Sequence, residues 1–125
     1  MTIALWCVLV AAVLPVCFAG AAKFGGVPGF NNRRPREFLE ALQGWQKRAH
    51  WAQLNSFEAF PAFAAAVIIA EMLNAAQNRV DLLAVSFILL RVGYGLAYIA
   101  DKQALRSLIW AAAFGCVVGL FVISA

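Results

Sequence analysis

Four apolar segments, each about long enough to cross a bilayer, follow one another along the chain with polar breaks between them. They span residues 1–22, 45–72, 80–100 and 104–124. A membrane's hydrocarbon core is about 30 Å thick, which takes about 20 helical residues to cross. With 64% hydrophobic and 13% charged residues, the 125-residue chain carries more apolar surface than a small soluble domain can bury. The sequence therefore predicts an all-α integral membrane protein, a single domain over 1–125.

The breaks between the segments predict the topology. Those at 74–78 and 101–103 are short, so consecutive helices should be antiparallel neighbours in an up-down four-helix bundle. The longer connection, 23–44, contains turn residues at 25–29 and a stretch at 37–42 that is expected to form a short helix. No basic residue precedes the first segment, which favours a retained helix; cleavage as a signal peptide is the alternative.

The lysines and arginines predict the orientation. Six of the ten lie in the first connection and its flanks: Lys23, Arg33, Arg34, Arg36, Lys47 and Arg48. The last connection and its flank hold Lys102 and Arg106, whereas the middle connection holds Arg79 alone. Because basic residues are enriched in cytoplasmic loops, the first and third connections should face the cytoplasm. Both termini should then lie on the non-cytoplasmic side.

The cysteine and histidine content argues against a disulfide framework or a metal centre. The three cysteines lie in apolar segments without CxxC spacing, where a free Cys packs as a small hydrophobic residue. They are Cys7, Cys17 and Cys116. His50 is the single histidine, and it is expected to lie exposed at the membrane surface. No metal is expected, and no nucleic-acid partner either, because the basic residues do not form a face on a soluble module.

Two repeated spacings predict helix contacts. Phe57, Phe60 and Phe63 form a stripe on one helical face, which indicates core packing or contact with lipid. Gly115 and Gly119 form a GxxxG motif, a weak indication of a close approach between helices.

Arg91 lies in the middle of the third apolar segment, where an arginine costs at least about 2.5 kcal/mol. It shares a helical face with Tyr94 and Tyr98. In the second segment, Asn55 and Glu58 share a face at a similar expected depth. These positions predict an ion pair between Glu58 and Arg91, within one subunit or across a subunit boundary, and a structural role for it is favoured over direct catalysis.

The polar residues near the expected cytoplasmic end can be interpreted in two ways. Arg106, Tyr94, Tyr98 and Asn55 could line a cavity open to the cytoplasm, whose guanidinium, phenol and amide donors suit an anionic ligand with carboxylates. Alternatively, Asn55 makes an interhelical hydrogen bond, Tyr98 belongs to the aromatic belt, and Arg106 is a positive-inside anchor.

Two motifs carry a resemblance to a known family. The segment RAHWAQLNSFEAFP at 48–61 resembles the RAxxAxxNxxExxP signature of the MAPEG family, the membrane-associated proteins in eicosanoid and glutathione metabolism. The segment RVGY at 91–94, together with Tyr98 and the pair Arg106-Ser107, is similar to the family's second signature. The resemblance covers nearly the whole chain and is nearest to the bacterial branch, which implies a bacterial inner membrane.

The resemblance implies a homotrimer of four-helix subunits that binds glutathione between adjacent subunits near the cytoplasmic face. The positions matching glutathione contacts are Gln53, Asn55, Glu58, Tyr94, Tyr98 and Arg106. The implied activity is that of a glutathione-dependent transferase or peroxidase acting on lipophilic electrophiles. Arg106 matches the position that stabilises the glutathione thiolate, and Ser107 is a weaker candidate for orienting the thiol. A nearby cation lowers a thiol pKa from about 8.5 toward neutrality.

The sequence departs from the family pattern at two positions. Trp51 stands where several eicosanoid enzymes carry an arginine that holds a glutathione carboxylate, and Ala59 is smaller than the residue found in some of them. Losing a charge-assisted hydrogen bond removes about 1.5–3 kcal/mol; Arg33, Arg34 and Arg48 are the candidates to compensate. These departures favour the alternative, a non-catalytic lipid-binding or scaffold protein of the same fold. A transporter is disfavoured because no inverted repeat is present.

Overall fold

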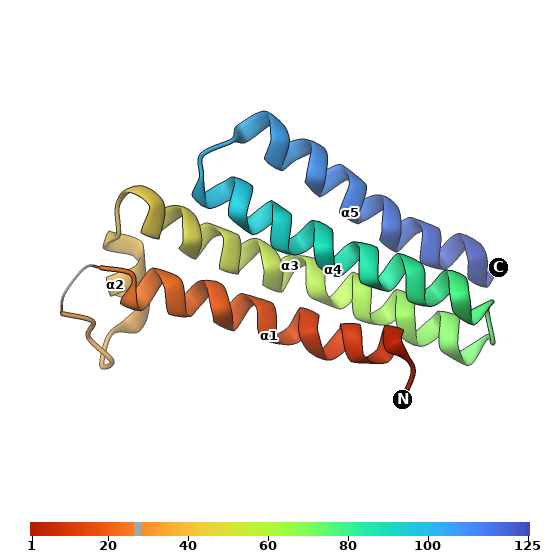
Figure 1. The fold of residues 1–125 in the computed structure, drawn as a ribbon. Coiled ribbons are helices and arrows are strands. Elements are labelled where there is room, and N and C mark those ends of the chain that lie inside the picture. The colour runs from red at the N-terminus through yellow and green to blue at the C-terminus, as the bar shows by residue number, and fades with distance from the viewer. Residues whose placement is uncertain (27–28) are drawn as a thin grey trace.

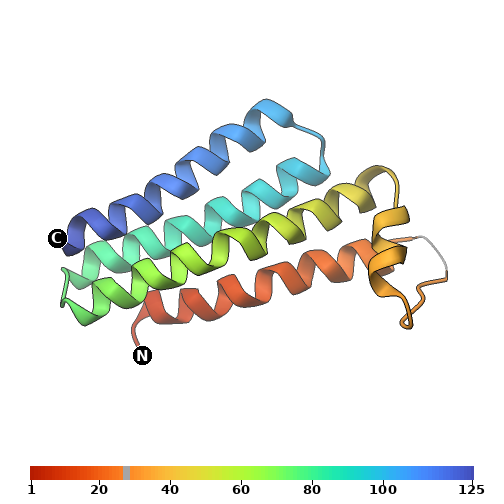
Figure 2. The same ribbon diagram turned by 180° about the vertical axis from the view of Figure 1, so that it is seen from behind.

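The structure is a computed structural model that describes residues 1–26 and 29–125, so the turn predicted at 25–29 lies partly outside the described residues. Its helices are α1 (Ile3–Phe24), α2 (Pro35–Ala41), α3 (Gly44–Met72), α4 (Gln77–Ile99) and α5 (Gln103–Ser124). The four long helices run side by side, and α2 lies across one end of them (Figure 1). Both termini lie at the opposite end (Figure 2). The all-α four-helix bundle predicted from the sequence is confirmed, and each long helix has the length and hydropathy to cross a membrane.

The short connections reverse the chain through left-handed residues. Asn74 (φ 53°) ends α3 and Asp101 (φ 59°) ends α4. After α4, the Lys102 amide donates to the Ala97 carbonyl (2.9 Å) and the Asp101 amide to the Tyr98 carbonyl (3.1 Å). The same pair of bonds closes α3. Asn and Asp tolerate the left-handed conformation, and these bonds satisfy carbonyls that a helix end leaves free. Each connection is therefore a tight antiparallel turn.

Small residues let the helices approach closely, and two aromatic residues fill the centre. Phe63 of α3 and Phe87 of α4 are almost fully buried and stack with ring centroids 3.9 Å apart. A Cβ on Gly95 would lie 1.9 Å from the Phe18 ring, so only glycine allows α1 to pack there. A Cβ on Gly119 would lie 3.3 Å from Leu83, whereas one on Gly115 would meet nothing within 4 Å. The GxxxG motif therefore contributes one close contact rather than two.

A polar network holds the N-terminus of α1 against α3 and α4. The Asp81 carboxylate accepts from the Ala4 amide (2.9 Å), one of the free N–H groups at the start of α1. The Thr2 hydroxyl donates to Glu71, and the Gln77 amide donates to both Glu71 (3.1 Å) and Asp81 (3.0 Å). Three helices are thus joined at the end of the bundle that carries both termini.

At the other end, α2 is held on the bundle by apolar packing and by a lysine. Leu39 and Leu42 are buried in a cluster with Ala22 of α1 and Ala49 of α3. The Lys47 ammonium donates to the Leu39 carbonyl (3.4 Å) and also to that of Glu40, and so caps the C-terminus of α2. The helix begins at Pro35, earlier than predicted, because a proline at the first helical position lacks only an N–H that would be unbonded anyway.

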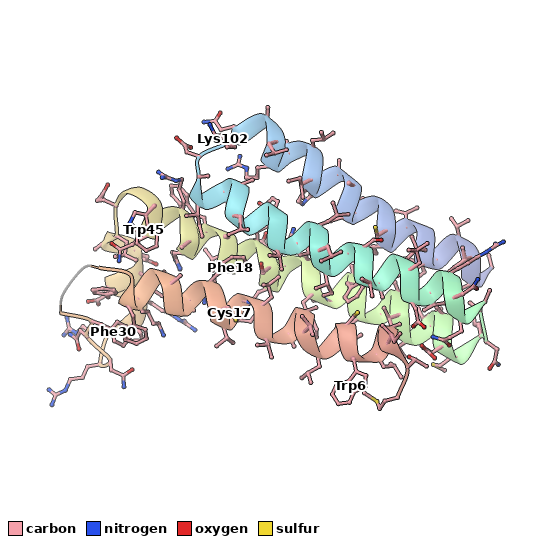
Figure 3. All side chains as sticks on the ribbon, in the orientation of Figure 1. Trp6, Cys17, Phe18, Phe30, Trp45 and Lys102 are labelled. Atoms are coloured by element: carbon pink, nitrogen blue, oxygen red, sulfur yellow. The ribbon has the colours of Figure 1, made fainter. Side chains whose placement is uncertain are left out.

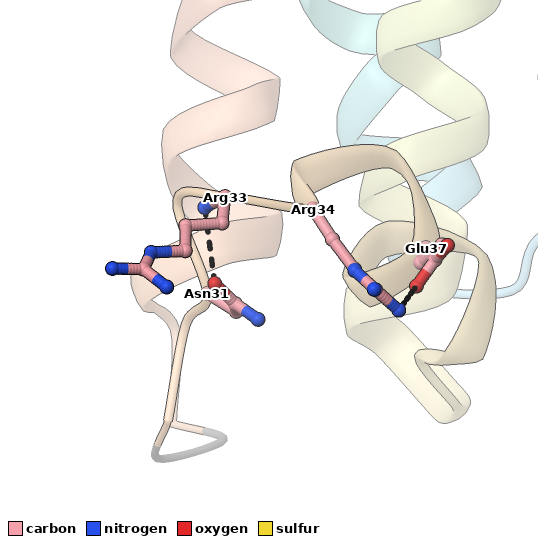
Figure 4. A network of polar contacts seen from close by, with 4 residues as sticks. All are labelled: Asn31, Arg33, Arg34 and Glu37. Atoms are coloured by element: carbon pink, nitrogen blue, oxygen red, sulfur yellow. Dashed lines mark hydrogen bonds and ion pairs between the residues drawn. The ribbon is translucent and has the colours of Figure 1, made fainter.

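Residues 30–38 make several short-range contacts with one another and with the end of α1. The Asn31 side chain accepts from the Arg33 amide (3.0 Å), and Arg34 pairs with Glu37 at 3.5 Å (Figure 4). Phe30 packs edge-to-face against Phe24 and Phe38, with ring centroids 5.4 and 5.3 Å apart. Figure 3 shows Phe30 and Trp45 at this end of the bundle and Trp6 at the other.

Candidate functional site

Arg91 is 2% exposed and is satisfied by neutral partners on α3. Its Nη2 donates to the Asn55 side-chain oxygen at 2.8 Å and to the Ser56 hydroxyl oxygen at 3.4 Å. The Ser56 hydroxyl in turn donates to the Ala52 carbonyl (2.8 Å). The guanidinium carbon lies 4.3 Å from the centre of the Tyr94 ring, a cation–π geometry. The buried charge is therefore bound by an amide, a hydroxyl and an aromatic face.

The predicted Glu58–Arg91 ion pair does not form within the described part of one subunit. The Asn55 side chain lies between the two charges: its oxygen accepts from Arg91, and its nitrogen donates to the Glu58 carboxylate at 3.3 Å. The within-subunit prediction was wrong because an amide offers both a donor and an acceptor and can bridge two opposite charges. Whether Glu58 pairs with Arg91 across a subunit boundary remains a prediction.

A ladder of two arginines with two tyrosine rings between them runs from Arg91 toward the end of the bundle that carries α2. Tyr94 and Tyr98 pack edge-to-face with centroids 5.7 Å apart, as expected for neighbours four residues apart on α4. The Arg106 guanidinium of α5 lies 4.2 Å from the centre of the Tyr98 ring. Trp51 of α3 lies on the other side of Tyr98, with centroids 6.2 Å apart. This ladder holds Arg106 beside two phenol groups.

Two polar cavities open along the ladder. One, of about 220 Å³, is called the donor cavity and is lined by Asn55, Tyr94, Tyr98, Arg106, Ser107 and Trp110. The other, of about 320 Å³, is called the outer groove and is lined by Trp51, Leu54, Asn55, Glu58, Tyr94 and Tyr98. The walls of the donor cavity come from α3, α4 and the first turns of α5. In this part of the bundle the ribbon of α5 diverges from α4 (Figures 1 and 2). Amide, phenol and guanidinium donors together can bind an anionic ligand.

The structure brings together seven of the eight candidate site residues named from the sequence. The exception is Gln53, whose side-chain oxygen lies 3.3 Å from Nδ1 of His50 and which lines neither cavity. His50 itself is 9% exposed, so the prediction of an exposed position was wrong. Its ring packs into the bundle, where Gln53 gives it a polar neighbour.

The site also contains Leu54, Ser56 and Trp110, which were not among the candidates. Ser56 contacts Arg91 directly, Leu54 lines the outer groove, and Trp110 lines the donor cavity. Trp110 could have been found from its spacing, because it follows Arg106 by four residues and therefore lies on the same face of α5. Ser56 could not have been found in this way, because Asn55 and Glu58 already explain the polar face of α3 and the serine adds no further spacing pattern.

Arg48, one of the three arginines expected to replace the carboxylate contact that is lost at Trp51, is already hydrogen-bonded elsewhere. The Arg48 Nε donates to the Ile99 carbonyl at 2.9 Å, so this side chain caps the C-terminus of α4. Of the other two candidates, Arg33 is exposed in the connection before α2, and Arg34 pairs with Glu37 (Figure 4). Within residues 1–26 and 29–125, no group of three or more His, Cys, Asp and Glu side chains lies close enough to hold a metal ion.

Comparison with known proteins places this architecture in a family. Residues 3–125 match the MAPEG family, and this range contains all four membrane-spanning candidates and every residue of both cavities. No curated protein matches the chain significantly. The four apolar helices and the match over nearly the whole length agree: the chain is an integral, multi-pass membrane protein that belongs to the MAPEG family.

Proposed function

We propose that the protein is a glutathione-dependent transferase with peroxidase-like capacity that acts on lipophilic electrophiles. Glutathione is bound near the cytoplasmic face, between subunits of a homotrimer. The observation that carries the proposal is the position of Arg106: its guanidinium lies over the Tyr98 ring, on the wall of the donor cavity beside Ser107. Family membership supports the choice of glutathione as co-substrate.

The chemistry requires a thiolate at neutral pH. A free thiol has a pKa of about 8.5, and a fixed cation beside it favours the ionised form. Arg106 provides that cation, and the Ser107 hydroxyl can donate to the same sulfur. The thiol proton passes to water, the thiolate sulfur forms a bond to the electrophilic carbon, and the leaving group departs with the bonding electrons. With a hydroperoxide, the thiolate sulfur attacks the terminal oxygen and the O–O bond breaks. The alkoxide takes a proton and leaves as an alcohol, and the sulfenic acid on sulfur condenses with a second glutathione to give the disulfide and water.

The remaining donors suit the rest of a peptide with two carboxylates and an ammonium group. Asn55, Tyr94 and Tyr98 border both polar cavities, while the Glu58 carboxylate borders the outer groove, where it can accept from an ammonium. Arg106 lies at the bundle end that holds α2 and the basic first connection. This placement supports a cytoplasmic position of the site, with both termini on the opposite side.

Glutathione binding to the purified protein in detergent, followed by conjugation of 1-chloro-2,4-dinitrobenzene, tests the proposal. Arg106→Ala should lower the rate at pH 7 about tenfold, because the thiol returns toward a pKa of about 8.5 and only a few per cent is ionised. The pH at which the rate is half-maximal should rise accordingly. Lys102→Ala is the matched control, since Lys102 is an exposed cation on the same side of the bundle that lines neither cavity. No binding at millimolar glutathione would rule the enzyme out.

One observation favours a second candidate, a non-catalytic lipid-binding or scaffold protein. Trp51 is 44% exposed and borders the outer groove beside Tyr98, with the Lys47 ammonium 5.8 Å from its ring centre. An indole there presents an apolar surface where related enzymes hold a carboxylate. The binding experiment separates the two candidates. Trp51→Arg should tighten glutathione binding if the site is otherwise competent.

A further inference from the structure

Four side chains from α1, α2 and the connection between them meet around one aromatic ring. Phe30 lies at the centre, edge-to-face against Phe24 and Phe38 with ring centroids 5.4 and 5.3 Å apart. The Lys23 ammonium lies 5.1 Å from the centre of the same ring, a cation–π contact. These four residues are called the aromatic–lysine cluster. Among the described residues, Lys23 has no carboxylate within 4.0 Å, so the protein does not neutralise its charge.

The aromatic–lysine cluster lies at the level of the lipid headgroups. The 22 residues of α1 make a helix about 33 Å long, slightly more than the roughly 30 Å of a bilayer's hydrocarbon core. Its last turn, with Lys23 and Phe24, therefore reaches the membrane surface. Trp45, exposed at the same end (Figure 3), packs so closely over Gly25 that a Cβ there would clash with the indole ring. Tryptophan is enriched at this level of a membrane, in agreement with the helix length.

Two arginines near the cluster also have no anionic partner in the part of the chain that the structure describes. Arg33 and Arg36 are exposed, whereas Arg34, between them, pairs with Glu37. Arg33 follows Phe30 by three residues, a separation of at most about 10 Å along the chain. The long arginine side chain can span this separation. One phosphate group can therefore contact both the cluster's ammonium and the Arg33 guanidinium, which suits phosphate because it donates two parallel hydrogen bonds.

One face of α1 offers an apolar track to lipid below the cluster. Val13, Cys17, Gly20 and Phe24 follow at spacings of four, three and four residues, which places them on one helical face. Their side chains are exposed, and a Cβ on Gly20 would meet nothing within 4 Å. An acyl chain can lie along this track with its headgroup at the cluster. Because lipid tails are as apolar as the helix face, the tail does not select among lipids, and selection falls to the headgroup.

We propose that the aromatic–lysine cluster and Arg33 bind the anionic headgroup of a phospholipid such as phosphatidylglycerol, with its acyl chain along α1. Each basic residue near a membrane surface favours an anionic lipid about fivefold, so Lys23 and Arg33 together should give a preference of about tenfold or more. Residues 23–43 carry four basic and two acidic side chains, so the surrounding charge also favours an anion. The proposal does not depend on the proposed function, because none of these residues lines the donor cavity or the outer groove.

Native mass spectrometry of the full chain, released from detergent with added lipid, tests the proposal. Dioleoylphosphatidylglycerol and dioleoylphosphatidylcholine carry the same acyl chains, so the difference between their dissociation constants reports the headgroup alone. Phosphatidylglycerol should bind about tenfold or more tightly than phosphatidylcholine. Glycerophosphoglycerol, the same headgroup without acyl chains, should not bind at the same concentration. This arm distinguishes a lipid site from a site for a soluble phosphate.

A matched pair of double variants locates the site. Lys23→Gln with Arg33→Gln should lower the affinity for phosphatidylglycerol about tenfold or more and leave that for phosphatidylcholine unchanged. Arg79→Gln with Lys102→Gln removes the same charge from exposed positions beside the other two connections. It should leave both affinities nearly unchanged, because at about 0.15 M salt exposed charges are screened beyond about 8 Å. Lys23→Arg should retain the preference for phosphatidylglycerol.

Three outcomes would overturn the proposal. The first is equal affinity of the native protein for the two lipids, or no saturable lipid binding, as expected if a second copy of the chain covers this face. The second is an equal loss of phosphatidylglycerol affinity in the two double variants. The third is binding of glycerophosphoglycerol as tight as that of the lipid. None of these measurements involves glutathione, so the transferase proposal and this one can fail separately.

Discussion

Replacing Asn55 by alanine tests whether this side chain, rather than a direct ion pair, stabilises the charge of Arg91. The substitution removes the 2.8 Å bond from Arg91 and leaves its Nη2 with the longer 3.4 Å contact to Ser56. A hydrogen bond to a charged group contributes about 1.5–3 kcal/mol. The second bond, from Asn55 to the exposed Glu58 carboxylate, contributes less than about 1 kcal/mol. The expected loss is therefore about 2–3 kcal/mol, most of it from the buried end.

Thermal unfolding in detergent, followed by size-exclusion chromatography of the folded fraction, measures this loss. For a chain of this size, about 2–3 kcal/mol lowers the midpoint by about 6–10 °C. Glu58→Ala should lower it by no more than about 3 °C, because Arg91 keeps its bond to Asn55. Gln103→Ala, an exposed amide at the start of α5 and outside the network, is the control. If Glu58→Ala destabilised the protein as much as Asn55→Ala, a direct ion pair would be present and the bridge through the amide would be refuted.

Two further substitutions test packing at the centre and at the α2 end. Phe63→Ala empties a fully buried site and should cost about 3–5 kcal/mol, whereas Phe57→Ala, at a 50% exposed position on the same helix, should leave the unfolding midpoint nearly unchanged. Lys47→Met removes the ammonium that caps α2 and should speed trypsin cleavage within 33–36 several-fold at an unchanged unfolding midpoint, while the exposed Lys102→Met should not. Equal cleavage rates in the two lysine variants would show that apolar packing alone holds α2.

The spans could be predicted from hydropathy because a bilayer requires apolar length, and this signal does not depend on tertiary contacts. The turns were also visible, since Asn74 and Asp101 are residue types that accept a left-handed conformation. The burial of His50 could not be predicted from the sequence. A lone imidazole near a helix start suggests the membrane surface, but the helix is rotated so that the ring points inward. Rotation about the helix axis is set by packing against neighbouring helices, which one helix's periodicity does not specify.

The periodicity of one helix does not specify its rotation, and this also explains why the within-subunit ion pair between Glu58 and Arg91 was predicted wrongly. Helical spacing placed Asn55 and Glu58 on one face, and it gave comparable depths for Glu58 and Arg91. It could not specify which of the two α3 side chains would come within bonding distance of the guanidinium. The structure gives that position to Asn55 and leaves Glu58 beyond it. A difference of one helical turn along α3 therefore decides whether the buried charge is neutralised by an anion or bound by a dipole.

The position of Asn55 between Arg91 and Glu58 determines which charges remain available at the candidate site. If Glu58 paired directly with Arg91, both charges would be occupied with each other, and the cavity walls would present only neutral donors and Arg106. With Asn55 between them, Arg91 is bound on α3, and the Glu58 carboxylate stays at the border of the outer groove, with Asn55 as its hydrogen-bond donor among the described residues. An ionised carboxylate can accept more bonds than this one. The bridge therefore separates the two charges, so that one stabilises the helix pair and the other remains accessible to a ligand.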